Sequence, residues 1–225
     1  MVPYLVIFDC DGTLVDSQHR ISASMSQAYR DCGLTPPEAA RTRTVIGMSL
    51  ELAIARLSPD LDTDKVHQVA ASYKEAFLSF RQQDLHAEPM FEGARQALDW
   101  LRGRDDVLLG VATGKSRRGL DSVLARENLH GHFTTLQTAD DAPSKPHPGM
   151  VQNALSETGG SIRRCVVIGD TSFDMEMAVN AGVKALGVSW GYHPPEHLRK
   201  CGAFEVLESY GALPEVLAPL LAGES

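Results

Sequence analysis

The sequence predicts an α/β protein in which a doubly wound parallel sheet carries an inserted all-helical segment. Three observations support this fold class. The short apolar run from Tyr4 to Phe8 is typical of a buried parallel strand. Residues 17–86 contain four helical patterns and no strand pattern. From residue 91 onward, strand patterns alternate with helical ones, as expected for parallel strands joined by helical crossovers.

The first strand ends in acidic residues. Asp9 and Asp11 follow it directly, and Gly12 and Thr13 come next. A period of two places Asp9 and Asp11 on the same side of an extended backbone, at the end of the strand where ligands bind in open α/β sheets. Two carboxylates about 4 Å apart repel each other by roughly 4 kcal/mol at an effective dielectric constant near 20. Keeping both ionised requires a cation, and a divalent one suits carboxylate oxygens best.

The helical segment follows this strand. Ile21, Met25, Ala28 and Cys32 recur at helical spacing, and Gly33 ends the pattern as a C-terminal cap would. Further helices are expected over about 36–47, 50–57 and 66–86. Linkers are expected near 15–18 and 86–89, and they would act as a hinge about which the helical segment closes over the site.

The second half of the chain supplies the remaining elements. Strands are expected at 107–113, 133–138, 165–169, 185–189 and 204–207, with helices at 91–101, 116–128, 147–158, 175–181 and 213–221. Several strand ends or loops carry a group suited to phosphate or metal. These groups are Thr113 and Gly114 in TGKS, Lys145 between Ser144 and Pro146, and Asp170 and Asp174 in GDTSFD.

The string DxDGTLxDS, together with these later groups, resembles the signature of the haloacid dehalogenase superfamily in its phosphatase branch. The helical insert resembles the small cap domain of the phosphoglycolate phosphatase and β-phosphoglucomutase branches. The resemblance implies a Rossmann-like core formed by residues 1–16 and 89–225, with a four-helix cap formed by residues 17–88.

The resemblance also implies roles for individual residues. Asp9 would attack phosphorus to give an aspartyl phosphate, while Asp11 would protonate the leaving alcohol and then activate water. Mg²⁺ would be bound by Asp9, by Asp170 and by the backbone carbonyl of Asp11, with Asp174 holding Lys145 or a metal-bound water. The expected phosphate-binding residues are Gly12, Thr13, Thr113, Gly114 and Lys145.

Composition excludes several other classes of protein. A net charge of −8 and the absence of a Lys/Arg cluster argue against nucleic-acid binding. The N-terminal apolar run is too short for a signal peptide or a membrane span. The four cysteines form no CxxC motif, which favours reduced thiols. A cytoplasmic protein is therefore expected, as a monomer or homodimer, and the resemblance implies that it acts on a small phosphorylated metabolite.

The substrate is less well defined by the sequence. Residues 187–193, GVSWGYH, resemble the corresponding stretch of phosphoglycolate phosphatases, although a strand followed by a packed loop would explain them equally well. The first substrate hypothesis is 2-phosphoglycolate. Alternatives are a β-phosphoglucomutase-like isomerase, a pyrophosphatase and a non-catalytic phosphate-sensing protein. Candidate specificity residues in the insert are His19, Arg20, Arg43 and Ser49.

Overall fold

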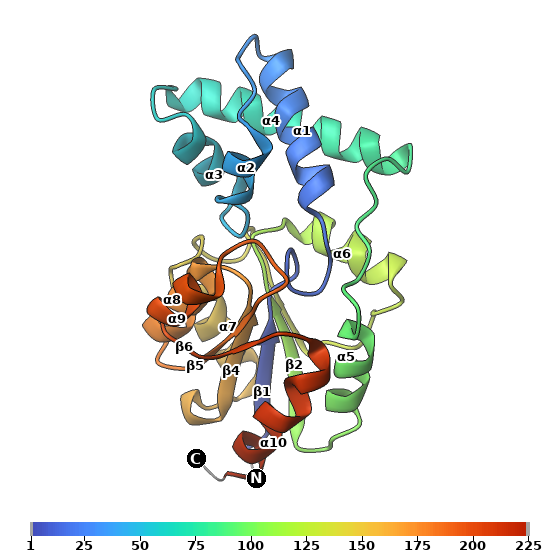
Figure 1. Ribbon diagram of the computed structural model, residues 1–225, viewed down its shortest axis with the longest axis vertical. Helices are drawn as coiled ribbons and strands as arrows, with labels where there is room; N and C mark the ends of the chain where they lie inside the picture. Colours follow the sequence, from blue (N-terminus) through green and yellow to red (C-terminus); the bar gives the residue numbers. More distant parts are fainter. Residues whose placement is uncertain (1, 224–225) are drawn as a thin grey trace.

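The computed structural model describes residues 2–223, and within them one six-stranded sheet forms the centre of the larger unit (Figure 1). The strand order is β3-β2-β1-β4-β5-β6, and every neighbouring pair is parallel. The strands are β1 (Tyr4–Phe8), β2 (Val107–Ala112), β3 (Thr135–Gln137), β4 (Cys165–Gly169), β5 (Lys184–Val188) and β6 (Ala203–Leu207). The predicted fold class is confirmed.

Helices cover both faces of this sheet. Strand β1 shows why, since Tyr4, Val6 and Phe8 pack into one core while Leu5 and Ile7 pack into the other. The first core is closed by α5 (Ala94–Arg102), α6 (Arg117–Arg126) and α10 (Leu213–Ala222). The second is closed by α7 (Gly149–Thr158), α8 (Ser172–Asn180) and α9 (Pro195–Lys200). Short 3-10 turns cover Ile162–Arg164 and Tyr210–Ala212.

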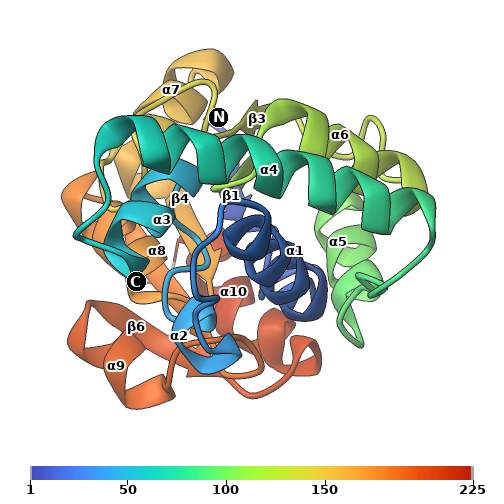
Figure 2. The same ribbon diagram turned by 90° about the horizontal axis from the view of Figure 1, so that it is seen from above.

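The helical insert stands above the carboxyl ends of the strands and has a core of its own (Figure 1). It contains α1 (Gln18–Asp31), α2 (Ala39–Arg43), α3 (Leu50–Leu57) and α4 (Thr63–Gln82). Seen from above, the long α4 runs across the top of the molecule beside α1 (Figure 2). Met25, Ile54, Val66 and Val69 are among the residues that α1, α3 and α4 bury against one another.

The two segments that join the insert to the sheet lie side by side. Asp16 N donates to Pro89 O at 2.8 Å, Phe91 N donates to Leu14 O at 3.0 Å, and Val15 forms an antiparallel bridge with Met90. These contacts lie at the linkers expected from the sequence. We retain the division into a core of residues 1–16 and 89–225 and a cap of residues 17–88 as a proposal.

Two helices differ from the sequence prediction. The helix expected over 36–47 is only five residues long in the structure, because the backbone is still extended at Glu38 and turns replace the helix after Arg43. Helix α9 was not predicted, since six residues beginning at a proline are too few to show a helical period.

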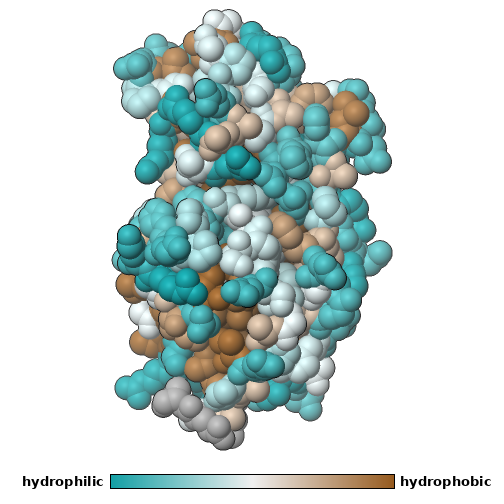
Figure 3. All heavy atoms as spheres, viewed as in Figure 1, coloured by the Kyte–Doolittle hydropathy of each residue, from teal (hydrophilic) through white to brown (hydrophobic). Residues whose placement is uncertain are grey.

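The surface and the helices fit the composition. The face in Figure 3 is mostly hydrophilic, with apolar residues gathered in the half that contains the sheet. Across residues 2–223, no helix has the combination of length and apolar character needed to span a membrane.

Candidate active site

Three buried carboxylates meet where the sheet reverses its strand order. Asp9 follows β1, Asp170 follows the neighbouring β4, and Asp174 lies in the first turn of α8. One oxygen from each lies within 4.8 Å of the others. Asp174 is fixed by a capping box in which Thr171 and Asp174 bond to each other's backbone N–H groups. The structure therefore brings together three of the acids that the sequence singled out.

Lys145 joins two of these carboxylates. Its Nζ lies 2.9 Å from Asp9 Oδ1 and 2.6 Å from Asp174 Oδ1, and its side chain is fully buried. Burial alone would lower the pKa of Lys145, but Asp174 and Asp9 raise it above its usual range. Lys145 is therefore a permanent cation between the two acids.

The charge of the cluster is not balanced by Lys145 alone. The pKa of Asp9 is raised to about 7, chiefly by burial and also by the neighbouring charges of Asp174 and Asp11, against the opposing effect of Lys145. The pKa of Asp170 is also raised, first by burial and then by Asp174 and Asp9. Moreover, Asp9 Oδ2 is buried and accepts no hydrogen bond from the described residues. Such an orphaned oxygen beside two more carboxylates suits a hard divalent cation such as Mg²⁺.

The loops around Asp170 hold it against Gly12. Asp170 Oδ1 accepts from Thr13 Oγ1 at 3.0 Å, and Oδ2 accepts from Tyr192 N at 2.9 Å. Gly12 has φ of +80°, and a Cβ added there would lie 2.2 Å from Asp170 Oδ2. Only glycine allows this close approach of backbone to carboxylate. Gly12 and Thr13 therefore lie at the cluster.

The segment 187–193 forms the opposite side of Asp170. It leaves β5 as a loop in which Trp190 Nε1 donates to Thr13 O at 3.2 Å, while Tyr192 contacts Asp170. Trp190 also packs at the edge of a sheet core, as the packed-loop interpretation expected. Segment 187–193 therefore helps to hold Asp170 in place in the cluster.

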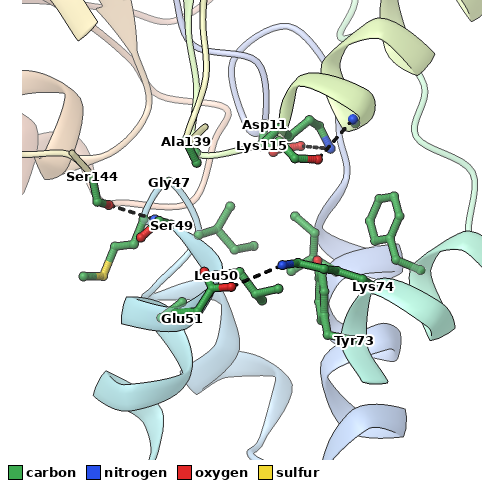
Figure 4. Close-up of a pocket in the computed structure, with 18 of the residues that line it drawn as sticks. Asp11, Gly47, Ser49, Leu50, Glu51, Tyr73, Lys74, Lys115, Ala139 and Ser144 are labelled. Carbon is green, nitrogen blue, oxygen red and sulfur yellow. Dashed lines mark hydrogen bonds and ion pairs between the residues drawn. The ribbon is translucent and has the colours of Figure 1, made fainter. Parts of the chain in front are cut away.

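Asp11 lies outside the three-carboxylate cluster. Its Oδ1 accepts from the Ser17 hydroxyl in a short contact and pairs with Lys115 Nζ at 2.9 Å (Figure 4). The Asp11 carboxylate is thus directed toward Ser17 and Lys115 and away from the cluster, which agrees with the expected metal contact through the Asp11 backbone carbonyl. That metal contact stays a prediction. Lys115 was not predicted as a site residue, because in the sequence it is only one residue of the TGKS stretch after the second strand.

Lys115 leads to a second buried network at the linker. It lies 3.3 Å from Glu88 Oε1, and Glu88 also pairs with Arg20 at 2.5 Å and with Arg126 at 3.3 Å. Burial alone would raise the pKa of Glu88, but Lys115, Arg20 and Arg126 together lower it. Arg20, expected to face the substrate, is instead buried at the linker beside Glu88. The proposed acid–base residue is thus connected to the segment that joins cap and core.

The cap reaches the core at a loop that begins with Gly47. Ser49 N donates to Ser144 Oγ at 2.8 Å (Figure 4). A Cβ added to Gly114 would lie 2.7 Å from both Gly47 O and Met48 O. Thr113, just before Gly114, is fully buried, and its Oγ1 accepts from Lys115 N at 3.2 Å. Of the other specificity candidates, His19 and Arg43 are exposed, and Arg43 contacts Gln18.

We expect Gly114→Ala to weaken closure of the cap, because the new methyl group would collide with two carbonyl oxygens of the cap loop. The expected result is a fall of about 10- to 100-fold in kcat/KM, as the cap no longer completes the site. Gly119→Ala is the matched control, since its Cβ would have no neighbour closer than 3.4 Å. Equal kinetics for both variants would contradict the assigned contact.

Comparison with known proteins gives a consistent result. The family model for haloacid dehalogenase-like hydrolases matches residues 6–188. Over 210 residues the chain is 32% identical to a Dickeya dadantii protein named probable phosphatase IndB, covering 92% of this chain and 90% of that protein. It is 28% identical over 222 residues to a phosphoglycolate phosphatase of Pseudomonas fluorescens, covering 97% and 81%. A hydrolase from Pseudomonas syringae superposes with a TM-score of 0.84 at 25% identity, covering 96% of this chain and 98% of that chain.

Proposed function

Because the chain belongs to the haloacid dehalogenase-like hydrolases, we propose that it is a magnesium-dependent phosphatase that cleaves a small phosphate monoester through a phosphorylated aspartate. The family and the enzyme class of phosphoric monoester hydrolase were predicted and are confirmed by the match and by the phosphatase-named relatives. The observation that carries the proposal is the orphaned Asp9 Oδ2 beside Asp170, with Lys145 on the other Asp9 oxygen.

In this proposal Asp9 is the nucleophile. Its Oδ1 accepts from Cys10 N at 2.7 Å and from Lys145, so that oxygen is held in place. Oδ2 has no protein partner among the described residues. An aspartate fixed in this way can attack phosphorus in line, giving an aspartyl phosphate and releasing the alcohol.

Asp11 would then be the acid and base. Ser17 and Lys115 hold its carboxylate away from the metal cluster, where it borders the cavity between cap and core. From that side it could protonate the leaving alcohol and afterwards remove a proton from the water that attacks the aspartyl phosphate. The two aspartates on one strand end would thus have different roles because different cations hold them.

Mg²⁺, when bound by Asp9, Asp170 and the Asp11 backbone carbonyl, would supply positive charge to the transferring phosphoryl group. Asp174 would keep Lys145 in position or hold a metal-bound water. Thr113, Gly12, Thr13, Gly114 and Lys145 are proposed to surround the phosphate oxygens with hydroxyl, amide and ammonium donors.

Thr113→Ala is expected to lower kcat by about 10²- to 10³-fold, the usual cost of losing one donor to the transition state. Thr113→Ser keeps the hydroxyl and should retain most of the activity. The measurement is steady-state phosphate release for both variants. If Ala and Ser variants lose activity equally, the hydroxyl is not the important group.

The proposed function is tested by phosphate release from a panel of monoesters, with magnesium and with chelator. The first substrate is 2-phosphoglycolate, because a relative at 28% identity carries the name phosphoglycolate phosphatase. Release that requires magnesium supports the proposal. Release unaffected by chelator would reject the metal, and no release from any ester would reject the phosphatase assignment in favour of the isomerase or the sensor.

A further inference from the structure

A cavity of about 610 Å³ lies between the cap and the core (Figure 4). Asp11 and Lys115 border it on the core side, together with loops around Gly114 and Ser144. Helices α1, α3 and α4 of the cap form the other side. The cavity therefore extends from the proposed acid–base residue, which is where the alcohol part of a phosphate monoester has to lie.

The cavity is much larger than a two-carbon acid requires. Phosphoglycolate has about nine non-hydrogen atoms, and at the roughly 30 Å³ that a water molecule occupies in the liquid these would fill at most about 270 Å³. That is less than half of the 610 Å³ present. By the same measure, the cavity has room for a molecule of about 20 non-hydrogen atoms.

The cap side of the cavity is mainly apolar. Tyr73 and Phe77 of α4 lie on it, with Phe77 placed so that Lys115 Nζ is 5.2 Å from its ring centroid. Tyr73 reaches the cavity beside Leu50 and Lys74 (Figure 4). Other apolar residues on this side include Ile21 and Met25 of α1 and Leu50 and Ala53 of α3.

Among the described residues, three of the four cations that line the cavity already have partners. Lys115 pairs with Asp11 and Glu88, Lys74 pairs with Glu51 at 3.2 Å, and Arg81 donates to Ser122 in a short contact. The fourth, Arg118, is exposed on α6 on the core side of the cavity. A carboxylate on the part of the alcohol that faces the cap would have to compete for the paired cations or face an apolar wall, and burying it there unpaired is costly. The lining therefore favours an alcohol with an apolar body.

We propose that the preferred substrate is a phosphate monoester of an apolar, aromatic-sized alcohol, which binds against Tyr73 and Phe77. This inference rests on the proposed phosphatase function and specifies its leaving group. The apolar body would lie on α1 and α4 of the cap while its phosphate meets Asp9. The transferred group and the two proposed chemical steps are unchanged.

The test compares 2-phenylethyl phosphate with ethyl phosphate and 2-phosphoglycolate. The first two release unactivated primary alcohols, so their ratio of kcat/KM reports mainly on binding of the phenyl group. We expect a ratio of about 10- to 100-fold in favour of the phenylethyl ester, as for burial of one aromatic side chain. We expect 2-phosphoglycolate to be no better than ethyl phosphate.

Phe77→Ala should reduce this ratio by about 10-fold. Phe80→Ala is the matched control, because Phe80 lies on the same helix but packs against His86 rather than lining the cavity. Phe80→Ala should leave the ratio unchanged. Equal ratios in wild type and both variants would overturn the assignment of Phe77.

Calorimetric titration of the wild type with 2-phenylethylphosphonate and ethylphosphonate gives a readout without turnover. Hydrolysis of all three esters with ethyl phosphate or 2-phosphoglycolate preferred would overturn the inference and leave the phosphatase function standing. No hydrolysis, with the phenylethyl phosphonate bound at least about 10-fold more tightly, would reject the phosphatase function and support the pocket. Neither hydrolysis nor a binding preference would reject both.

Discussion

Asp9→Asn is expected to reduce phosphate release to background, a loss on the order of 10⁴-fold or more, as when a covalent nucleophile is removed. The amide keeps the size of the side chain but cannot form the phosphorylated intermediate. It also removes the negative charge of the Asp9 carboxylate, whose Oδ2 lies at the metal cluster without a partner among the described residues. The measurement is magnesium-dependent release from the best ester of the panel, and retention of more than a tenth of wild-type turnover would reject Asp9 as nucleophile.

Asp16→Asn is the matched control for this variant. Asp16 belongs to the same DxDGTLxDS string, but its carboxylate is half-buried and bonds to Gln18 rather than to the cluster. We expect it to retain most of the activity. A similar loss in both variants would indicate that the strand end as a whole had been disturbed.

Thermal unfolding shows whether Asp9→Asn remains folded. Burial raises the pKa of Asp9 from 3.8 to about 7, so the unfolded chain loses this proton first as pH rises. In metal-free protein the free energy of unfolding should therefore fall progressively as pH rises from about 4 to about 7, because Asp9 is harder to ionise in the folded state. The Asn variant lacks this cost, and in chelator at pH 8 its Tm should be no lower than that of the wild type.

Much of the sheet and of the acidic cluster could be predicted because the signals are local. An apolar run ending in Asp9 indicates both a buried strand and a polar group at its end, and the same holds for Asp170. Pro146, directly after Lys145, is likewise a local signal, because a proline restricts the backbone of the residue before it. Parallel pairing of β1 with β4 then places these ends next to each other.

The network at the linker could not be predicted in the same way. Glu88 lies in a linker, Arg126 at the end of a helix, and each has the sequence context of an ordinary surface residue. Only the fold places them beside Lys115 and Arg20 and buries Glu88 to 3% exposure. No spacing in the sequence encodes a contact between side chains on separate elements.

The same limit applies to the close approaches of glycine. The sequence places Gly12 just after the first strand, but the contact that requires glycine there comes from Asp170, on another strand end. Gly114 is likewise constrained by the cap loop at Gly47. The type of residue at each position was informative, while its tertiary reason became apparent only from the structure.

Lys145→Met is expected to destabilise the metal-free protein by about 3–5 kcal/mol, the usual cost of removing one partner from a buried ion pair. Asp9 and Asp174 would both lose the cation that pairs with them. All three side chains are buried, so water would not replace the lost charge. For a chain of this size the loss corresponds to a fall in Tm of roughly 6–20 °C. Activity should fall by about 10³-fold, since a phosphate-binding charge is lost as well.

Lys200→Met serves as the control, because Lys200 is exposed at the end of α9 and is not part of the cluster. It should change Tm little. The double variant Lys145→Met with Asp174→Asn distinguishes charge from packing. If the cost of Lys145→Met comes from uncompensated carboxylates, adding Asp174→Asn should recover part of the Tm, with a coupling energy of about 0.5–3 kcal/mol. If the two losses simply add, Lys145 stabilises the fold through packing, and its proposed role as the cation of the cluster is wrong.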